Sequence, residues 1–178
     1  MKHLLKHIAV GTVVTGVSVL LLGTVACATG VRINATKSIP VGLYRLTSDP
    51  VEKGAYVMFC PPQTGVFDYA KKRGLIGAGF CPGGYGYMMK RVLAAKNDAV
   101  SISDEGVRVN DELLPHSTPI KTDKAGQPLP RFQADRFTLG SSELLLMSDV
   151  CRTSFDGRYF GPINRSQIKG VIRPVFTW

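Results

Sequence analysis

The chain has 178 residues, of which 44% are hydrophobic, and it carries 22 Lys and Arg against 13 Asp and Glu. This length predicts one domain, with or without an anchor, and is sufficient for a hydrophobic core. The net charge of +9 would suit nucleic acid or anionic lipid headgroups. The basic residues are scattered, however, and no RNA-binding aromatic motif or recognition-helix pattern occurs. We therefore expect a basic solubilising surface and no nucleic-acid partner.

Residues 1–30 are predicted to form a signal or membrane-anchor segment. From Ile8 to its end the segment has no charged residue, and as a helix it is long enough to cross a hydrocarbon core about 30 Å thick. The lysines before it favour a cytoplasmic start, which would place residues 31–178 outside. The A-x-A pattern at residues 26–28 suits cleavage by a signal peptidase. The segment is therefore either removed or retained as an anchor.

Most of residues 31–178 have the pattern of short β-strands separated by Gly, Pro, Asn and Asp turns. The strand-like segments are, in chain order, GLYRL, GAYVMFC, GYGYMMKRVLAA, DAVSIS, GVRVN, ELLP, LLLMSD and IKGVIRPVF. The segment VFDYAKKRGLI predicts one short helix that ends at Gly74. Residues 115–135 are polar and rich in Pro, which predicts a loop or a small insertion on the sheet. The predicted fold is mainly β.

The cysteines predict one disulfide. Cys60 and Cys81 each stand beside Pro, in FCPP and FCPGG, and bracket a Gly-rich stretch. Because disulfides persist in exported proteins, we expect these two to pair and Cys151 to remain free. The chain has no C-x-x-C and no H-x-x-x-H pattern, so no zinc site is predicted. Neither a metal nor any other cofactor is expected.

Histidine is a poor candidate for a general base in this chain. His3 and His7 precede the apolar segment, on the other side of the membrane, and His116 lies in a polar loop. A Ser-His-Asp triad would have to be built on His116 alone. Lysine can act as a base if burial lowers its pKa from about 10.4 to about 7 or 8.

Lys90 lies in a strand-like run in which Met88 and Val92 share its face and Arg91 points to the other face. Arginine is not deprotonated in proteins, so Lys90 is the only base that this strand offers. Periodicity alone does not say which face is buried. The alternative is a lysine on the surface of an edge strand.

Ser38 is a candidate nucleophile because it directly follows the apolar segment, at the expected membrane surface. Pro40 fixes the backbone there, and Gly42 permits close approach of a bound chain. A hydroxyl from Thr36, together with the Ser38 N–H, would form an oxyanion hole. Near the other end of the chain, SFDGRYFGP contains Asp156, whose alternative interpretation is an Asp-Gly turn with Arg158 paired to it on the surface.

Three segments in this order, TKSIPVGLYRL, KRVLAAKNDAV and LLLMSDVCRTSFDGRYFGPI, resemble the sequence boxes of the signal peptidase S26 family. The S-x-P-x-G-L-Y form is typical of its conjugative-transfer branch, the TraF peptidases. Bacterial leader peptidases have two residues between the Ser and the Pro, where this chain has only Ile39.

This resemblance implies a membrane-associated Ser/Lys-dyad peptidase with a coiled β-sheet catalytic domain facing the periplasm. By position, Ser38 matches the nucleophile and Lys90 the general base. Thr36 falls where leader peptidases carry an oxyanion-hole hydroxyl. Asp156 matches an acid that belongs to the active site in the TraF branch; the sequence leaves open whether it orients Lys90 or binds an incoming amine.

TraF-like members process the conjugative pilin precursor, so the resemblance implies this substrate. They remove a short C-terminal peptide and join the new C-terminus to the pilin's own N-terminus through an acyl-enzyme, which requires no ATP. The expected partners are the pilin precursor, the inner membrane and other mating-pair-formation proteins. Two alternatives remain open: a signal peptidase that hydrolyses exported preproteins, or a non-catalytic anchored component of the transfer apparatus.

Overall fold

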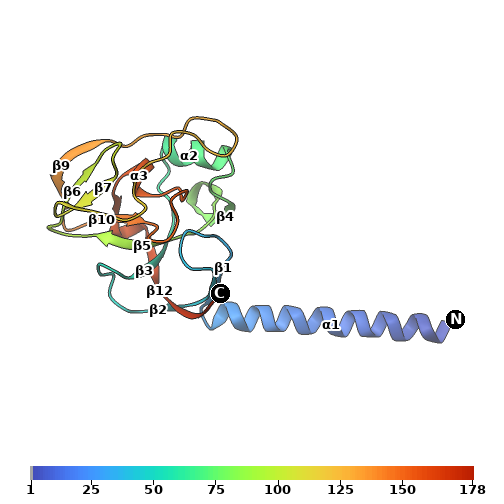
Figure 1. Cartoon of the computed structure of the whole chain (residues 1–178). Coiled ribbons are helices and arrows are strands. Elements are labelled where there is room, and N and C mark those ends of the chain that lie inside the picture. Colours follow the sequence, from blue (N-terminus) through green and yellow to red (C-terminus); the bar gives the residue numbers. More distant parts are fainter. Residues whose placement is uncertain (1) are drawn as a thin grey trace.

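The computed structural model describes residues 2–178 and contains one long helix outside a compact β domain (Figure 1). Helix α1 (Lys2–Ala28) projects from the β domain at the end where β1 begins. Its segment Lys6–Val25 has a mean hydropathy of 2.2 and is not buried in the protein, so it is long and apolar enough to cross a membrane.

The β domain consists of two antiparallel sheets in the described part of the chain. The larger sheet has the strand order β1-β2-β12-β3-β5-β10-β11, and the smaller sheet has the order β8-β7-β6-β9. Together with α1 this architecture confirms the predicted mainly β fold. The strands are β1 (Val31–Asn34), β2 (Gly42–Thr47), β3 (Tyr56–Phe59), β4 (Ala78–Cys81), β5 (Met88–Ala94), β6 (Ala99–Ile102), β7 (Val107–Val109), β8 (Glu112–Leu113), β9 (Ala134–Thr138), β10 (Glu143–Met147), β11 (Ile163–Asn164) and β12 (Ile168–Thr177).

The helices of the β domain are short. Helix α2 (Gly65–Lys72) confirms the predicted helix, and Gly74 follows it in the left-handed conformation that favours glycine. The four-residue α3 (Gly157–Phe160) was not predicted, because one turn is too short to give a periodic pattern. Two 3₁₀ turns, η1 (Pro82–Gly84) and η2 (Arg165–Gln167), complete the set.

Strand β5 is an inner strand of the larger sheet, between β3 and β10. Its side chains alternate, so that Met88, Lys90, Val92 and Ala94 are buried and the residues between them are half-buried. The buried face is therefore the one that carries Lys90. The alternative of a surface lysine on an edge strand is wrong, since Lys90 is 3% exposed.

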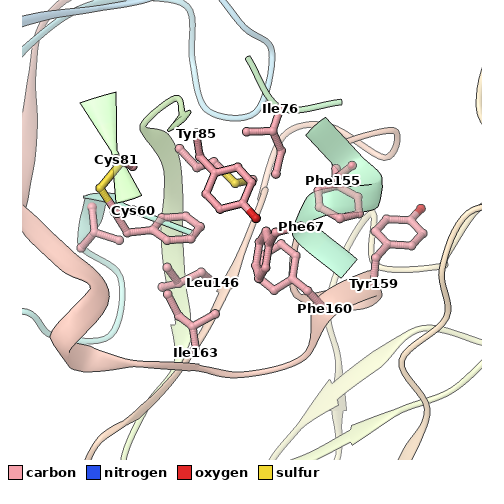
Figure 2. Close-up of a cluster of buried hydrophobic side chains, with 14 of the residues drawn as sticks. Cys60, Phe67, Ile76, Cys81, Tyr85, Leu146, Phe155, Tyr159, Phe160 and Ile163 are labelled. Carbon is pink, nitrogen blue, oxygen red and sulfur yellow. A yellow bond between two sulfur atoms is a disulfide. The ribbon is translucent and has the colours of Figure 1, made fainter. Parts of the chain in front are cut away.

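Aromatic side chains of α2, α3 and the segment before α3 pack together against the sheet in one buried cluster (Figure 2). The rings of Phe67 in α2 and Phe160 in α3 are 4.8 Å apart, and Phe155 packs edge-on against Phe67. This cluster fixes the segment that leads from β10 into α3. The Cys60–Cys81 disulfide lies at the border of the same cluster, and Cys151 is free.

Removing the disulfide by the double substitution Cys60→Ala and Cys81→Ala should lower the free energy of unfolding by about 3 kcal/mol. The bond closes a loop between cysteines 21 residues apart, and releasing such a loop enlarges the unfolded ensemble. Urea unfolding of the full chain in detergent micelles, followed by circular dichroism, would measure this. Cys151→Ala is the matched control and should leave stability nearly unchanged. Equal loss in both variants would contradict the prediction.

Candidate active site

Ser38 lies in the connection between β1 and β2, and one buried asparagine organises this connection. Asn34 Nδ2 lies 2.8 Å from the carbonyl oxygen of Thr36 and 3.0 Å from those of Ile39 and Pro40. These bonds bind both ends of the loop to the end of β1. Sequence analysis did not identify Asn34, because nothing in its local pattern marks a buried amide.

Ser38 and Lys90 line the same cavity, which has a volume of about 300 Å³. The cavity is open to solvent on the Ser38 side, whereas Lys90 is buried at its base on β5. Burial lowers the pKa of Lys90 from its ordinary value of 10.5 to about 8, and the Arg158 guanidinium adds to this lowering. The Asp156 carboxylate acts in the opposite direction. Roughly a tenth of Lys90 is therefore neutral at pH 7, far more than for an exposed lysine.

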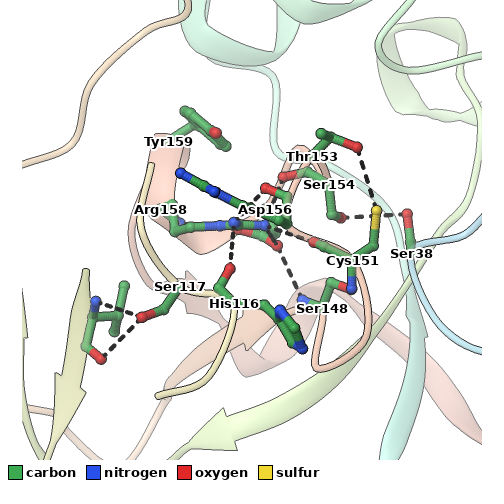
Figure 3. Close-up of polar contacts among 12 residues, drawn as sticks. Ser38, His116, Ser117, Ser148, Cys151, Thr153, Ser154, Asp156, Arg158 and Tyr159 are labelled. Atoms are coloured by element: carbon green, nitrogen blue, oxygen red, sulfur yellow. Dashed lines mark hydrogen bonds and ion pairs between the residues drawn. The ribbon is translucent and has the colours of Figure 1, made fainter. Parts of the chain in front are cut away.

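Ser38 Oγ accepts a hydrogen bond of 3.4 Å from the hydroxyl of Ser154 (Figure 3). Ser154 is buried and precedes α3 by three residues. The sequence analysis assigned no role to Ser154. A pattern that could have indicated a role is the spacing in SFDGR: the polar residues Ser154, Asp156 and Arg158 are two residues apart, and all three are buried.

Asp156 and Arg158 form an ion pair in which both side chains are 0% exposed. One carboxylate oxygen of Asp156 accepts bonds from Arg158 N and Nε, and the other accepts from Arg158 Nη2 and Ser148 N. All four contacts are 2.7–3.2 Å long. The surface-pair alternative is therefore wrong: the pair exists, but inside the protein.

The Arg158 guanidinium also organises the segment that carries Ser154. It donates to the carbonyl oxygens of Cys151, Arg152 and Ser154, and to that of His116 from the loop opposite (Figure 3). Asp156 itself lines none of the cavities around Ser38. Its side chain contacts Arg158, and its charge raises the pKa of Lys90.

Thr36 lines the cavity together with Ser38. Its hydroxyl donates to Asn34 Oδ1 at 2.9 Å, and its backbone N–H approaches the same oxygen at 3.2 Å. The Thr36 side chain is therefore held beside Ser38, with its hydroxyl proton directed at Asn34. It would have to rotate before it could donate to an oxyanion.

The geometry excludes the histidine-based alternative. His116 is exposed and contributes a backbone carbonyl oxygen to Arg158, and its side chain does not line the Ser38 cavity. No group of three or more His, Cys, Asp or Glu within residues 2–178 could hold a metal ion. What the cavity offers is a serine hydroxyl and a buried lysine, the two parts of a nucleophile and base pair.

A family model described as signal peptidase, peptidase S26, matches residues 4–178. The chain therefore belongs to the peptidase S26 family of signal peptidases, in its TraF group. It is 72% identical over 178 residues to an Escherichia coli protein named plasmid transfer protein TraF, with 100% of both chains covered. It is 36% identical over 171 residues to conjugal transfer protein TraF of Agrobacterium fabrum strain C58, covering 94% of this chain and 92% of that protein. These findings confirm the resemblance predicted from the three sequence boxes.

Among solved structures, a signal peptidase I from Enterococcus faecalis matches with a TM-score of 0.40 and 13% sequence identity. The match covers 71% of this chain and 100% of that one.

Proposed function

We propose that this protein is a membrane-anchored Ser/Lys peptidase that processes the conjugative pilin precursor and closes it into a ring. The observation that carries the proposal is the buried Lys90, whose pKa is lowered to about 8, in the cavity that Ser38 lines. A lysine serves as a general base only when neutral, and burial on β5 supplies that condition.

In the first half of the reaction, neutral Lys90 takes the proton of the Ser38 hydroxyl as Ser38 Oγ attacks a peptide carbonyl near the pilin C-terminus. The peptide C–N bond then breaks, and protonated Lys90 returns its proton to the leaving amine. The pilin stays attached to Ser38 as an ester, and the short tail departs. Ser38 Oγ and Lys90 Nζ share no hydrogen bond in the structure, so the site must tighten when substrate binds, as apo sites often do.

In the second half, the ester reacts with an amine or with water. If the pilin's own N-terminal amine is held beside the ester, its effective concentration greatly favours ring closure over hydrolysis. The amine gives up a proton as the new peptide bond forms, and the Ser38 hydroxyl is regenerated. No ATP is required, because the ester conserves the free energy of the cleaved bond. No cofactor takes part.

The apolar helix α1 and the family together indicate association with a membrane or the cell envelope. We place the β domain on the periplasmic face of the inner membrane, where other mating-pair-formation proteins would be its neighbours. Ile33 in β1, Phe176 near the end of β12 and the C-terminal Trp178 are large exposed apolar side chains. The C-terminus lies beside the end of α1 (Figure 1), so these side chains suit contact with the membrane surface.

The test is to coexpress the pilin precursor of the same conjugative system with the wild-type chain or with Ser38→Ala, and to measure intact pilin masses. A product lighter than the linear hydrolysis product by one water would support ring closure. The linear product would replace the cyclase with a hydrolysing signal peptidase. A precursor that keeps its mass with wild-type protein, or pilus assembly that survives Ser38→Ala, would favour the non-catalytic alternative.

The rate of tail removal at subsaturating substrate should rise with pH through a midpoint of about 8. The reason is that the native pKa of Lys90 is lowered to about 8, and only the neutral amine accepts the Ser38 proton. The measurement is kcat/KM for a pilin C-terminal peptide between pH 6 and 10. The stability of the protein is checked separately at each pH, so that unfolding is not mistaken for lost activity. A profile that is flat between about pH 7 and 9 would remove Lys90 from the role of base.

Replacing Asn34 with alanine should reduce kcat/KM by about 100-fold, because a loop that moves the nucleophile by about 1 Å costs that much. Its free energy of unfolding should fall by about 1–3 kcal/mol, since three carbonyl oxygens lose their donor. The control is Asn164→Ala, which removes a surface cap on η2 and should leave kcat/KM unchanged. Equal activity in the two variants would show that Asn34 does not position Ser38.

A further inference from the structure

Ser38 stands at the start of a groove that leads away from Lys90. A cavity of about 310 Å³ is lined by Ser38 and also by Lys124 and Thr153. Lys124 and Thr153 in turn line a third cavity of about 440 Å³. The shared residues therefore put three cavities in a row, with Lys90 in the first. Leu75 and Phe155 belong to the lining of all three and make one apolar floor. Each is within the size range of ligand sites, about 300–1,000 Å³.

The far wall of this groove is a rigid turn within residues 121–129. The Asp123 carboxylate accepts from the N–H groups of Ala125 and Gln127 at 2.9 and 3.0 Å, and a backbone bridge joins Thr122 to Pro128. Arg73 at the end of α2 forms an ion pair with Asp123. The backbone that carries Lys124 is therefore held in place, although the sequence predicted only a loop or insertion here.

The groove has an unbalanced positive charge. Lys37 and Lys124 both line it and are exposed, and neither has a carboxylate within ion-pair distance among residues 2–178, whereas Arg73 is already paired. An apolar floor with free ammonium groups above it suits a short peptide that ends in a carboxylate. The main chain of an internal segment brings no charge for these lysines, so only a terminal carboxylate supplies one whatever the sequence of the tail.

The position of the membrane decides which end of the substrate lies in this groove. The first cavity borders β1, which follows α1 directly, so this is the side nearer the membrane. A pilin precursor that is itself a membrane protein would approach Ser38 from there. The turn beside α2 lies at the other end of the β domain, away from α1 (Figure 1). The groove is therefore on the leaving-tail side of the scissile bond.

We infer that Lys124, assisted by Lys37, binds the terminal carboxylate of the leaving tail, so that the enzyme recognises a free C-terminus at a short distance from the bond it cuts. This inference rests on the proposed function and names the substrate feature that the same site would select. It explains why the groove is short and closed by a rigid turn. It makes Lys124 a specificity residue that takes no part in proton transfer.

The experiment compares two synthetic peptides that span the C-terminus of the pilin precursor, one with a free carboxylate and one amidated. The full chain in detergent micelles should cleave the free acid with about tenfold higher kcat/KM, mainly through KM, as expected for one charge-assisted hydrogen bond at a partly exposed site. Lys124→Ala should reduce this ratio to nearly one. The matched control is Lys121→Ala, an exposed lysine on the same turn that lines none of the three cavities, and it should keep the wild-type ratio.

Equal cleavage of both peptides by the wild-type chain would overturn the inference while leaving the peptidase intact. A tenfold preference that persists in Lys124→Ala would overturn it as well. Cleavage of neither peptide would instead overturn the proposed function, and the inference with it. A second measurement does not need turnover: a fluorescent tail peptide should bind Ser38→Ala more tightly as the free acid than as the amide.

Discussion

Replacing Lys90 with methionine should abolish tail removal and at the same time make the protein more stable. The general base contributes about 100- to 10,000-fold to the rate of such a reaction. Methionine fills a similar volume on an inner strand of the larger sheet without a charge. Activity assays on the pilin peptide and urea unfolding, both at pH 7, measure the two effects.

The gain in stability should depend on pH in a defined direction. The pKa of Lys90 is about 8 in the folded protein and 10.5 without burial, so the unfolded chain binds more protons between these values. Stability of the wild-type chain therefore rises as pH increases from about 8 to 10.5 and is lowest below pH 8. The advantage of Lys90→Met should approach roughly 3 kcal/mol below pH 8 and shrink above it.

The matched control is Lys96→Met, which removes a lysine outside the strands and away from the Ser38 cavity. It should change neither activity nor the pH dependence of stability by a measurable amount. If Lys90→Met were less stable than the wild-type chain at pH 7, the charge of Lys90 would be contributing to the fold, and burial would not be what lowers its pKa.

Replacing Asp156 with asparagine should destabilise the protein by about 3–5 kcal/mol, because it leaves the charge of Arg158 buried and unpaired. Asparagine has one acceptor oxygen where the carboxylate has two, and its amide N–H groups would face the N–H groups of Arg158 and Ser148. That loss is a large part of the total stability of a typical domain. Urea unfolding followed by circular dichroism measures it.

The control is Asp111→Asn, which neutralises the acid of an exposed ion pair with Arg136. Exposed pairs contribute at most about 1 kcal/mol, so this variant should unfold much like the wild-type chain. A similar small loss in Asp156→Asn would contradict the structural importance of the buried pair. The double variant Asp156→Leu with Arg158→Met should recover part of the stability without recovering activity.

A pH profile separates a structural role of Asp156 from a direct effect on the base. The Asp156 carboxylate raises the pKa of Lys90, and Arg158 lowers it. Removing the carboxylate should therefore move the midpoint of the activity profile below that of the wild-type chain. The midpoint is read from the folded fraction of Asp156→Asn, since the unfolded fraction is inactive. A purely structural role would lower activity and leave the midpoint unchanged.

The sequence by itself determined the class of the fold and two central residues of the candidate site. An uninterrupted apolar run predicts a helix by length alone, and alternating segments predict strands, because both patterns depend only on local periodicity. The same alternation placed Lys90 opposite Arg91, and chemistry selected the lysine. Ser38 followed from its position after the apolar run. The strands β1, β4, β9 and β11 and the one-turn α3 were missed, since they are short and have no distinctive periodic pattern.

Only the tertiary structure decided which face of β5 is buried, because that depends on the aromatic cluster of α2 and α3 that packs over the face with Met88 and Val92. It also decided that the Asp156–Arg158 pair is internal and that Ser154 meets Ser38, two residues separated by 116 positions in the chain. Lys124 likewise acquired a proposed role only once its turn was brought beside the loop that carries Ser38. The bonds of Asn34 are local, within six residues, but the amide could act only where the fold buries it. Local sequence patterns show which residues alternate along a strand. The burial and neighbouring charges that lower the pKa of Lys90, however, come from segments far apart in the chain.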